Sequence, residues 1–213
     1  MAEYLRAAQR ILVFTGAGIS TASGIPAFRG AGGVWTTRQP VYYQDFMARE
    51  ESRIEYWQYK LEMWEAHGDA QPNAVHQAIV QLEQANKVAM VVTQNVDGLH
   101  RAAGTSEELL VEVHGTGTLV ECQSCGDRNE VAPSLAAFKE TGEPPVCHCG
   151  GYLKPATISF GQSLREEDLT RAFAAAALCD LVIALGSPLS VSPANGIPLD
   201  GAQRGAKYII INR

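Results

Sequence analysis

The stretch RILVFTGAGIS (Arg10–Ser20) runs from a short apolar segment into a loop that contains two glycines. The apolar run Arg10–Phe14 is rich in Ile, Leu and Val without strict alternation, which is typical of a parallel strand covered by helices on both faces. Similar runs occur at Val88–Val92, Asp180–Leu185 and Lys207–Asn212. Three of the four runs end in a glycine or polar loop, and such loops at the carboxyl ends of parallel strands form a ligand crevice.

Helical patterns lie between these runs. The clearest covers Ala74–Lys87, where apolar residues fall on one stripe, and a second covers Glu166–Leu178. A further apolar run, LLVEV (Leu109–Val113), predicts one more strand. The alternation of strands and helices predicts the α/β class with a doubly wound, mostly parallel sheet.

The overall composition is that of an ordinary globular protein, with 46% apolar and 19% charged residues among 213. A net charge of −6 argues against a direct nucleic-acid partner. No run approaches the roughly 18 apolar residues of a membrane span, and the N-terminal MAEYLRAAQR lacks the apolar core of a secretory signal. We therefore expect a cytoplasmic protein without a membrane partner, whose five cysteines are metal ligands or core residues rather than disulfides.

Two stretches interrupt the alternation. Residues 31–70 are rich in aromatic side chains and predict a helical insert. Residues 118–157 hold four of the five cysteines and few apolar runs, which predicts a small inserted module that needs a staple other than a hydrophobic core. The remaining segments, 1–30, 71–117 and 158–213, then form the parallel-sheet domain.

The four cysteines of the second stretch form a C-x2-C pair and a C-x-C pair, each followed by glycine: Cys122, Cys125, Cys147 and Cys149. Paired thiolates on tight turns at this separation suit a tetrahedral zinc ion. We expect this zinc ion to be structural and not catalytic, because four sulfur ligands leave no open coordination position for a substrate. His148 competes as a fourth ligand, and four free thiols in a loop are the alternative without metal.

The glycine loop after Phe14 precedes a predicted helix, and backbone amides at a helix N-terminus can cradle phosphate. A tight strand-to-helix turn explains the same residues, since the loop lacks a complete phosphate-binding motif. The segment QNVDG places polar side chains at the end of a second strand, and His114 follows a third run. An amide, a carboxylate and an imidazole therefore converge on the crevice, where a histidine can take a proton from a substrate hydroxyl.

Several motifs follow one another in a recognisable order: GAGIS with GIPAFRG, TQNVDGLH, HG, the paired cysteines, ISFG, and GSPLSVSPANGIPL. Over Ile11–Arg213 the chain resembles the sirtuins, the NAD-dependent protein deacylases. The resemblance implies a Rossmann-like NAD domain, a small domain with structural zinc, and a cleft between them for acyl-lysine of a protein or peptide. It also implies transfer of the acyl group to ADP-ribose with release of nicotinamide.

The resemblance also assigns site residues. His114 is implied as the general base, with Asn95 and Asp97 as further catalytic residues. The implied NAD site consists of Gly16, Ala17, Gly18, Ser20, Phe28, Arg29, Gln94, Asn95, Asp97, Gly186, Ser187, Asn212 and Arg213. The segment that pairs with the substrate backbone is implied to include Ile158, Phe160 and Gly161, as a case of β-strand addition.

The chain departs from the family pattern in three places. Ala27 stands where the family motif has an aspartate near the nicotinamide end, and loss of a charged hydrogen bond costs on the order of 1.5–3 kcal/mol. The sequence stops at IIINR, before the loop and helix that complete the adenine pocket in the family, which predicts weaker NAD binding. Gln162 stands where many relatives have glutamate, at the rim of the cleft. We therefore expect activity that Ala27 impairs.

Two further expectations concern specificity and reaction class. The stretch EYWQYKLEMW offers Tyr56 and Tyr59 without the arginine that accompanies acidic acyl groups in the family, so a neutral acyl group such as acetyl is expected. The same cleft also suits an ADP-ribosyltransferase or an NAD glycohydrolase, or a catalytically weak module that binds NAD or acyl-lysine. His76 and His100 are expected to pack or to support nearby loops rather than to act in catalysis.

Overall fold

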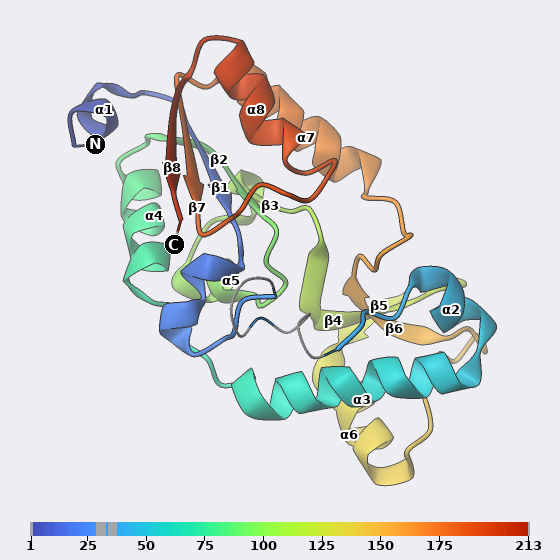
Figure 1. Ribbon diagram of the computed structural model, residues 1–213. Helices are drawn as coiled ribbons and strands as arrows, with labels where there is room; N and C mark the ends of the chain where they lie inside the picture. Colours follow the sequence, from blue (N-terminus) through green and yellow to red (C-terminus); the bar gives the residue numbers. More distant parts are fainter. Residues whose placement is uncertain (1, 29–32, 34–37, 213) are drawn as a thin grey trace.

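A five-stranded parallel sheet forms the larger part of the molecule (Figure 1). The computed structural model describes residues 2–28, 33 and 38–212. Its strands lie in the order β3-β2-β1-β7-β8 and all run in the same direction. They are β1 (Ile11–Thr15), β2 (Val88–Thr93), β3 (Leu110–Glu112), β7 (Leu181–Leu185) and β8 (Lys207–Ile211). The prediction of an α/β protein with a parallel sheet is confirmed.

Helices cover both faces of this sheet, which explains the unbroken apolar runs of the strands. Leu12 and Phe14 of β1 pack on one face, with residues of α7 (Glu166–Leu178) and α8 (Gly196–Gln203). The alternate residues of β1 pack on the opposite face, near α1 (Ala2–Ala7) and α4 (Ala74–Gln84). A short helix, α5 (Leu99–Ala103), follows β2, and a single 3-10 turn, η4 (Glu107–Leu109), precedes β3. None of the helices among the described residues is long and apolar enough to cross a membrane.

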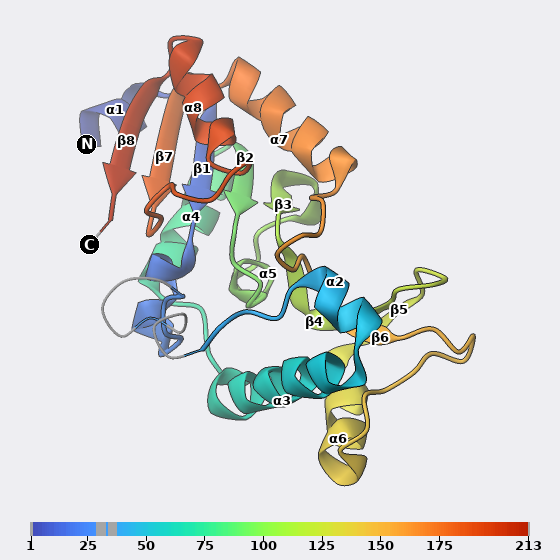
Figure 2. The same ribbon diagram turned by 45° about the vertical axis from the view of Figure 1, so that its right-hand side comes forward.

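The two inserted stretches pack together into a second, smaller lobe (Figure 2). Its antiparallel sheet has the order β5-β4-β6 and contains the strands β4 (Gly115–Cys122), β5 (Arg128–Glu130) and β6 (Leu153–Thr157). Three helices accompany it: α2 (Tyr43–Ala48), α3 (Glu50–His67) and α6 (Val131–Thr141).

The small lobe has a hydrophobic core that the cysteine module shares with the helical insert. Trp57 of α3 is fully buried, and its indole Nε1 donates to the carbonyl of Leu153 at 3.2 Å. Val120, Val131, Leu135 and Phe138 of the cysteine module pack in the same cluster as Phe46, Tyr56 and Trp57. The apolar residues of each stretch are too few to form a core alone, so the core appears only when both stretches come together.

Candidate functional site

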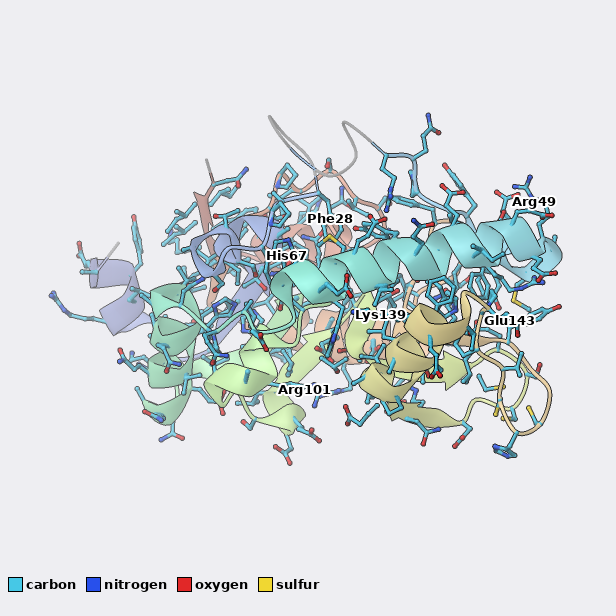
Figure 3. The ribbon with its side chains drawn as sticks, turned by 90° about the horizontal axis from the view of Figure 1, so that it is seen from below. Phe28, Arg49, His67, Arg101, Lys139 and Glu143 are labelled. Carbon is cyan, nitrogen blue, oxygen red and sulfur yellow. The ribbon has the colours of Figure 1, made fainter. Side chains whose placement is uncertain are left out.

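A cavity of about 1150 Å³ opens between the carboxyl ends of the parallel strands and the small lobe. Ligand sites for one small molecule usually measure roughly 300–1,000 Å³, so this cavity has room for a large cofactor with a second substrate. The loops after β1, β2 and β7 form one side, and α3 with the segment 157–164 forms the other. Figure 3 shows Phe28, a residue of the cavity wall, on the opposite side of α3 from Lys139 of α6.

The glycine loop packs directly on the loop that follows β7. The amide of Gly18 donates to the carbonyl of Gly186 at 2.9 Å, and that of Gly16 donates to Leu185 at 3.0 Å. A Cβ atom on Gly18 would lie 2.8 Å from the Cα and O atoms of Gly186, which itself has a φ of 62°. Glycine is therefore required at both contact points, because any side chain would push the two loops apart.

The local structure of this loop differs from the prediction. The residues after β1 form two single 3-10 turns, η1 (Ala17–Ile19) and η2 (Thr21–Ser23), and no α-helix begins between Gly16 and Phe28. The amides of Gly16 and Gly18 donate to protein carbonyls, so they hold the loop against Gly186 and are not presented to a phosphate. The expectation of an amide cradle at a helix N-terminus is wrong at these two residues.

His114 is held by the residue that begins the QNVDG segment. Its ring Nδ1 lies 3.1 Å from the carbonyl oxygen of Gln94. A carbonyl only accepts hydrogen bonds, so Nδ1 carries the proton and the neutral ring has its lone pair on Nε2. The Gln94 side chain is fixed in turn, because its Nε2 donates to Ser187 Oγ at 2.7 Å. Gln94, His114 and Ser187 all line the cavity, which places a nitrogen base in its wall.

Asn95, Ser20 and Asp97 form a second network beside the first. Asn95 is 4% exposed, and its Nδ2 donates to Ser20 Oγ at 3.1 Å and to the carbonyl of Gly16 at 3.3 Å. Ser20 Oγ donates to Asp97 Oδ2 at 2.7 Å, while Asp97 Oδ1 accepts from the amide of Leu99 at 2.9 Å. Asn95 reaches the cavity wall, whereas Ser20 and Asp97 lie behind it.

The structure brings most of the other expected residues to the same wall: Gly16, Ala17, Gly18, Phe28, Gly186, Ile158, Phe160, Gly161 and Asn212, together with Ala27. Arg29 and Arg213 lie outside the described residues. Two residues of the helical insert also form hydrogen bonds with the segment that is expected to bind substrate. The amide of Tyr43 donates to the carbonyl of Phe160 at 2.9 Å, and Gln44 Nε2 donates to the carbonyl of Gly161 at the same distance. No local sequence pattern predicts these two contacts, because their residues are far apart in the chain.

Helix α3 and Arg38 add a polar patch to the cavity wall, and this patch contains both tyrosines of the EYWQYKLEMW stretch. Tyr56, Tyr59, Lys60 and Arg38 line the cavity, and Tyr56 Oη lies 2.9 Å from Thr157 Oγ1. Burial alone would raise the pKa of Tyr56. The nearby ammonium groups of Lys60 and Lys154 and the hydrogen bond with Thr157 outweigh that effect and lower the pKa to about 7. Burial raises the pKa of Tyr59 to about 12.

The four cysteines of the small lobe converge on one point. Their Sγ atoms all lie within 4.8 Å of one another, with 3.5 Å between Cys122 and Cys149 and 3.8 Å between Cys125 and Cys147. Four sulfurs placed about 2.3 Å from a central zinc ion would be about 3.8 Å apart, so the donor set fits zinc. The amides of Ser124 and Cys125 donate to Cys122 Sγ and lower the pKa of that thiol, which favours the thiolate that binds metal.

His148 is placed differently from the four thiols. It is exposed, and it groups with Asp127 and Cys147 rather than with the complete set of cysteines. None of the four cysteines lines the cavity. The cluster therefore suits structural zinc, at a distance from any chemistry in the cavity.

A family model matches the part of the chain that carries both sites. The model is described as the Sir2 family, and it covers residues 16–193. The chain belongs to the Sir2 family. A relative from Bradyrhizobium diazoefficiens, named NAD-dependent protein deacetylase 1, is 42% identical over 213 residues, which are all of this chain and 84% of the relative.

Solved Sir2 structures agree with this chain in fold. One, described under the structural basis for the mechanism and regulation of Sir2 enzymes, has a TM-score of 0.87 at 36% identity and covers 99% of this chain and 84% of its own. Another Sir2 protein, bound to a propionylated peptide, has a TM-score of 0.87 at 30% identity with the same coverage. The Sir2 match begins at the first glycine of the loop and includes His114 and all four clustered cysteines, whereas β8 and Asn212 lie beyond it.

Proposed function

We propose that this Sir2 protein is an NAD-dependent protein deacylase that removes an acyl group from lysine side chains. The observation that carries the proposal is the pairing of His114 with Gln94 in the wall of a cavity large enough for a cofactor and a substrate. The fold and family agree with it, because a relative is named NAD-dependent protein deacetylase 1 and a structural neighbour is bound to a propionylated peptide.

The residues present in the cavity fit NAD. We assign the cofactor to the loops at the carboxyl ends of β1, β2 and β7, where Ala17, Phe28, Asn95 and Gly186 line the wall. When bound there, NAD would supply a ribose whose carbon releases nicotinamide and whose hydroxyl group receives the acyl group. Asn95 holds the glycine loop at this site through its hydrogen bonds with Gly16 and Ser20. Asp97 does not line the cavity and acts on the site through its hydrogen bond with Ser20 Oγ.

His114 acts as the general base in this assignment. Its Nε2 takes a proton from a hydroxyl group in the cavity, a role that needs the neutral ring with its lone pair on Nε2. The Gln94 carbonyl enforces that tautomer and stabilises the imidazolium that forms, because it accepts the Nδ1 proton in both charge states. Ser187 supports the arrangement by holding the Gln94 side chain.

The acyl-lysine is assigned to the side of the cavity formed by α3 and by the segment after β6. Ile158 lies next to the base, because its amide donates to the carbonyl of His114 at 2.8 Å. We propose a neutral acyl group such as acetyl, since α3 offers Tyr56 and Tyr59 without an arginine in step. Zinc bound to the four cysteines would hold the small lobe together and would take no part in the reaction.

The experiment that tests the function is nicotinamide release from NAD, measured with and without an acetyl-lysine peptide. We expect release that depends on the peptide. An Ala27→Asp variant is expected to release nicotinamide roughly tenfold to hundredfold faster, because it restores a charged hydrogen-bonding group at the cavity wall. Equal release with and without peptide would contradict the deacylase assignment and would favour a glycohydrolase or a transferase.

A further inference from the structure

Asn73, the residue before α4, contacts the back of the glycine loop. Its Oδ1 accepts from the amide of Val75 at 2.9 Å and so caps the helix. Its Nδ2 donates to the carbonyl of Ile19 at 2.8 Å and to Ser23 Oγ at 2.9 Å. Ile19 lines the cavity whereas Asn73 does not. Asn73 therefore joins the end of a helix to the loop from the side away from any ligand.

The glycine loop depends on such outside contacts for its position. Most of its internal backbone hydrogen bonds are those of the two 3-10 turns, such as Ile19 to Gly16 and Gly24 to Thr21, and one further bond joins Ile25 to Ser20. Short 3-10 turns have poor hydrogen-bond geometry and little stability of their own. Gly186 holds one side of the loop, Asn95 and Asp97 hold its middle through Ser20, and Asn73 holds its far side through Ile19 and Ser23.

Two buried histidines continue the contact from Asn73 into the sheet. The amide of Asn73 donates to His76 Nδ1 at 3.3 Å, which completes a capping box. The rings of His76 and His100 are 0% and 2% exposed and meet edge to face with 5.0 Å between their centroids. His100 Nε2 lies 3.0 Å from Thr15 Oγ1 at the end of β1. The amide of Gln94 donates to the carbonyl of Thr15 at 3.0 Å, so the network ends at the residue that holds His114.

This histidine pair is not explained by packing alone. His76 Nε2 and His100 Nδ1 are buried and have no hydrogen-bond partner among the described residues. Each such atom is unfavourable for folding, and apolar side chains of similar shape would avoid the cost. The other ring nitrogens bond to Asn73 and Thr15, the two points between which the network runs.

We propose that Asn73 is a positioning residue for the NAD site, and that His76, His100 and Thr15 form the buried support that sets its place relative to Gln94. This inference rests on the proposed function for the identity of the ligand. Asn73 acts through the Ile19 carbonyl and Ser23 and touches neither cofactor nor substrate. Loss of its two donor contacts should loosen the loop in the free protein and weaken NAD binding, with little effect on the chemical step.

The matched variant is Asn73→Asp. It keeps an oxygen acceptor for the amide of Val75, and a carboxylate is also favoured at a helix N-terminus, so the cap survives. It removes both donors and sets a carboxylate against the carbonyl of Ile19. The control is Asn86→Asp, which adds the same charge at the opposite end of α4, on an exposed residue. Asn73→Ala removes the cap as well and separates the two roles of the side chain.

Two readouts decide the matter: amide hydrogen exchange of Ile19–Ile25 in the free protein, and the split between KM for NAD and kcat. For Asn73→Asp we expect exchange in this segment and KM to rise about tenfold each, with kcat changed less than about threefold, as for the loss of one or two hydrogen bonds. The thermal midpoint should fall by about 3–6 °C. The Asn86→Asp control should match the unchanged protein in both readouts.

Unchanged exchange and unchanged KM in Asn73→Asp would overturn the inference while leaving the deacylase assignment intact. A fall in kcat without a rise in KM would also overturn it, since that pattern indicates a merely structural role. If the unchanged protein shows no NAD-dependent activity, the proposed function fails by itself. The exchange of Ile19–Ile25 then still decides whether Asn73 holds the loop.

Discussion

The two lobes of this molecule build their sides of the cavity in different ways. The parallel-sheet lobe uses unbroken apolar strands, and its loops meet through backbone contacts such as that between Gly18 and Gly186. In the small lobe the strand β5 is exposed along its whole length, and the structure depends on one aromatic cluster and four thiols. The first side of the cavity is therefore set by close packing, whereas the second depends on an aromatic cluster and on a thiol cluster that lies outside the cavity.

The largest effect should come from breaking the metal site with Cys122→Ser. Structural zinc contributes roughly 10–16 kcal/mol of binding free energy in small zinc domains, so the small lobe should lose its fold and the protein its activity. We expect zinc content to fall and the fluorescence of buried Trp57 to change, while the helical signal of the parallel-sheet lobe persists.

The control for this experiment is Cys179→Ser. Cys179 lies after α7, and its Sγ bonds to the carbonyl of Ala176, far along the chain from the four thiols. Full zinc content is expected in the control. A Cys122→Ser protein that kept its zinc and its activity would show that the thiol cluster does not hold the lobe together.

The next largest effect is expected from His114→Asn, which removes the base and leaves both lobes intact. General base catalysis contributes roughly a hundredfold to ten-thousandfold, so kcat should fall by that factor. NAD affinity, measured by calorimetry, should change little, because His114 is one residue among many in the wall. A variant with full kcat would show that His114 is not the general base.

Close packing on the first side can be tested with Gly18→Ala. The added Cβ would lie 2.8 Å from backbone atoms of Gly186, and forced overpacking usually costs about 1–3 kcal/mol. We expect lower stability in urea and weaker NAD binding. Gly196→Ala is the control, since its Cβ would meet only Phe173 at 3.7 Å. If both variants were equally stable, close packing would not set the loop.

The smallest effect concerns pH. Burial, together with the neighbouring His76, lowers the pKa of His100 to about 3. The ordinary value is 6.5, so between pH 6.5 and about 3 the unfolded chain binds a proton that the folded protein does not. Stability is therefore fully present above pH 6.5 and is lost as the pH falls.

Between pH 7.5 and 5.5 this one residue should account for about 1.4 kcal/mol of lost unfolding free energy. Burial also lowers the pKa of His76, which faces Asp97, and adds a loss of the same sign. The measurement is urea unfolding at both pH values for the unchanged protein and for His100→Gln, which keeps a partner for Thr15 but does not titrate. Equal pH dependence in the two proteins would contradict the assignment.

The sequence predicted the parallel-sheet lobe closely, because buried parallel strands are continuous apolar runs. The strands predicted to begin at Val88, Asp180 and Lys207 have both of their ends within one residue of the predicted bounds. The helix at Glu166–Leu178 matches its prediction, with three acidic residues in its first turn. Asp180 itself stays outside β7, because its carboxylate accepts from the amides of Gln9 and Arg10 before β1.

The remaining features arise from contacts between distant segments, which no local pattern reports. The core of the small lobe joins Trp57 to Phe138, whose rings lie 6.1 Å apart between centroids. The amides of Gly16 and Gly18 donate to Leu185 and Gly186, far along the chain, so these two glycines serve loop packing although their pattern is typical of phosphate binding. The contact of Asn73 with Ile19 could not be predicted, because the sequence pattern of a helix cap does not indicate a second contact made by the same side chain.

The most direct test of the deacylase assignment is the stoichiometry of the reaction on an acetyl-lysine peptide. Mass spectrometry measures the amounts of the products. We expect one deacetylated lysine and one acetylated ADP-ribose for each nicotinamide released. Nicotinamide formed while the lysine stays acetylated would contradict it, and the cavity would then have to be assigned to another NAD-consuming reaction.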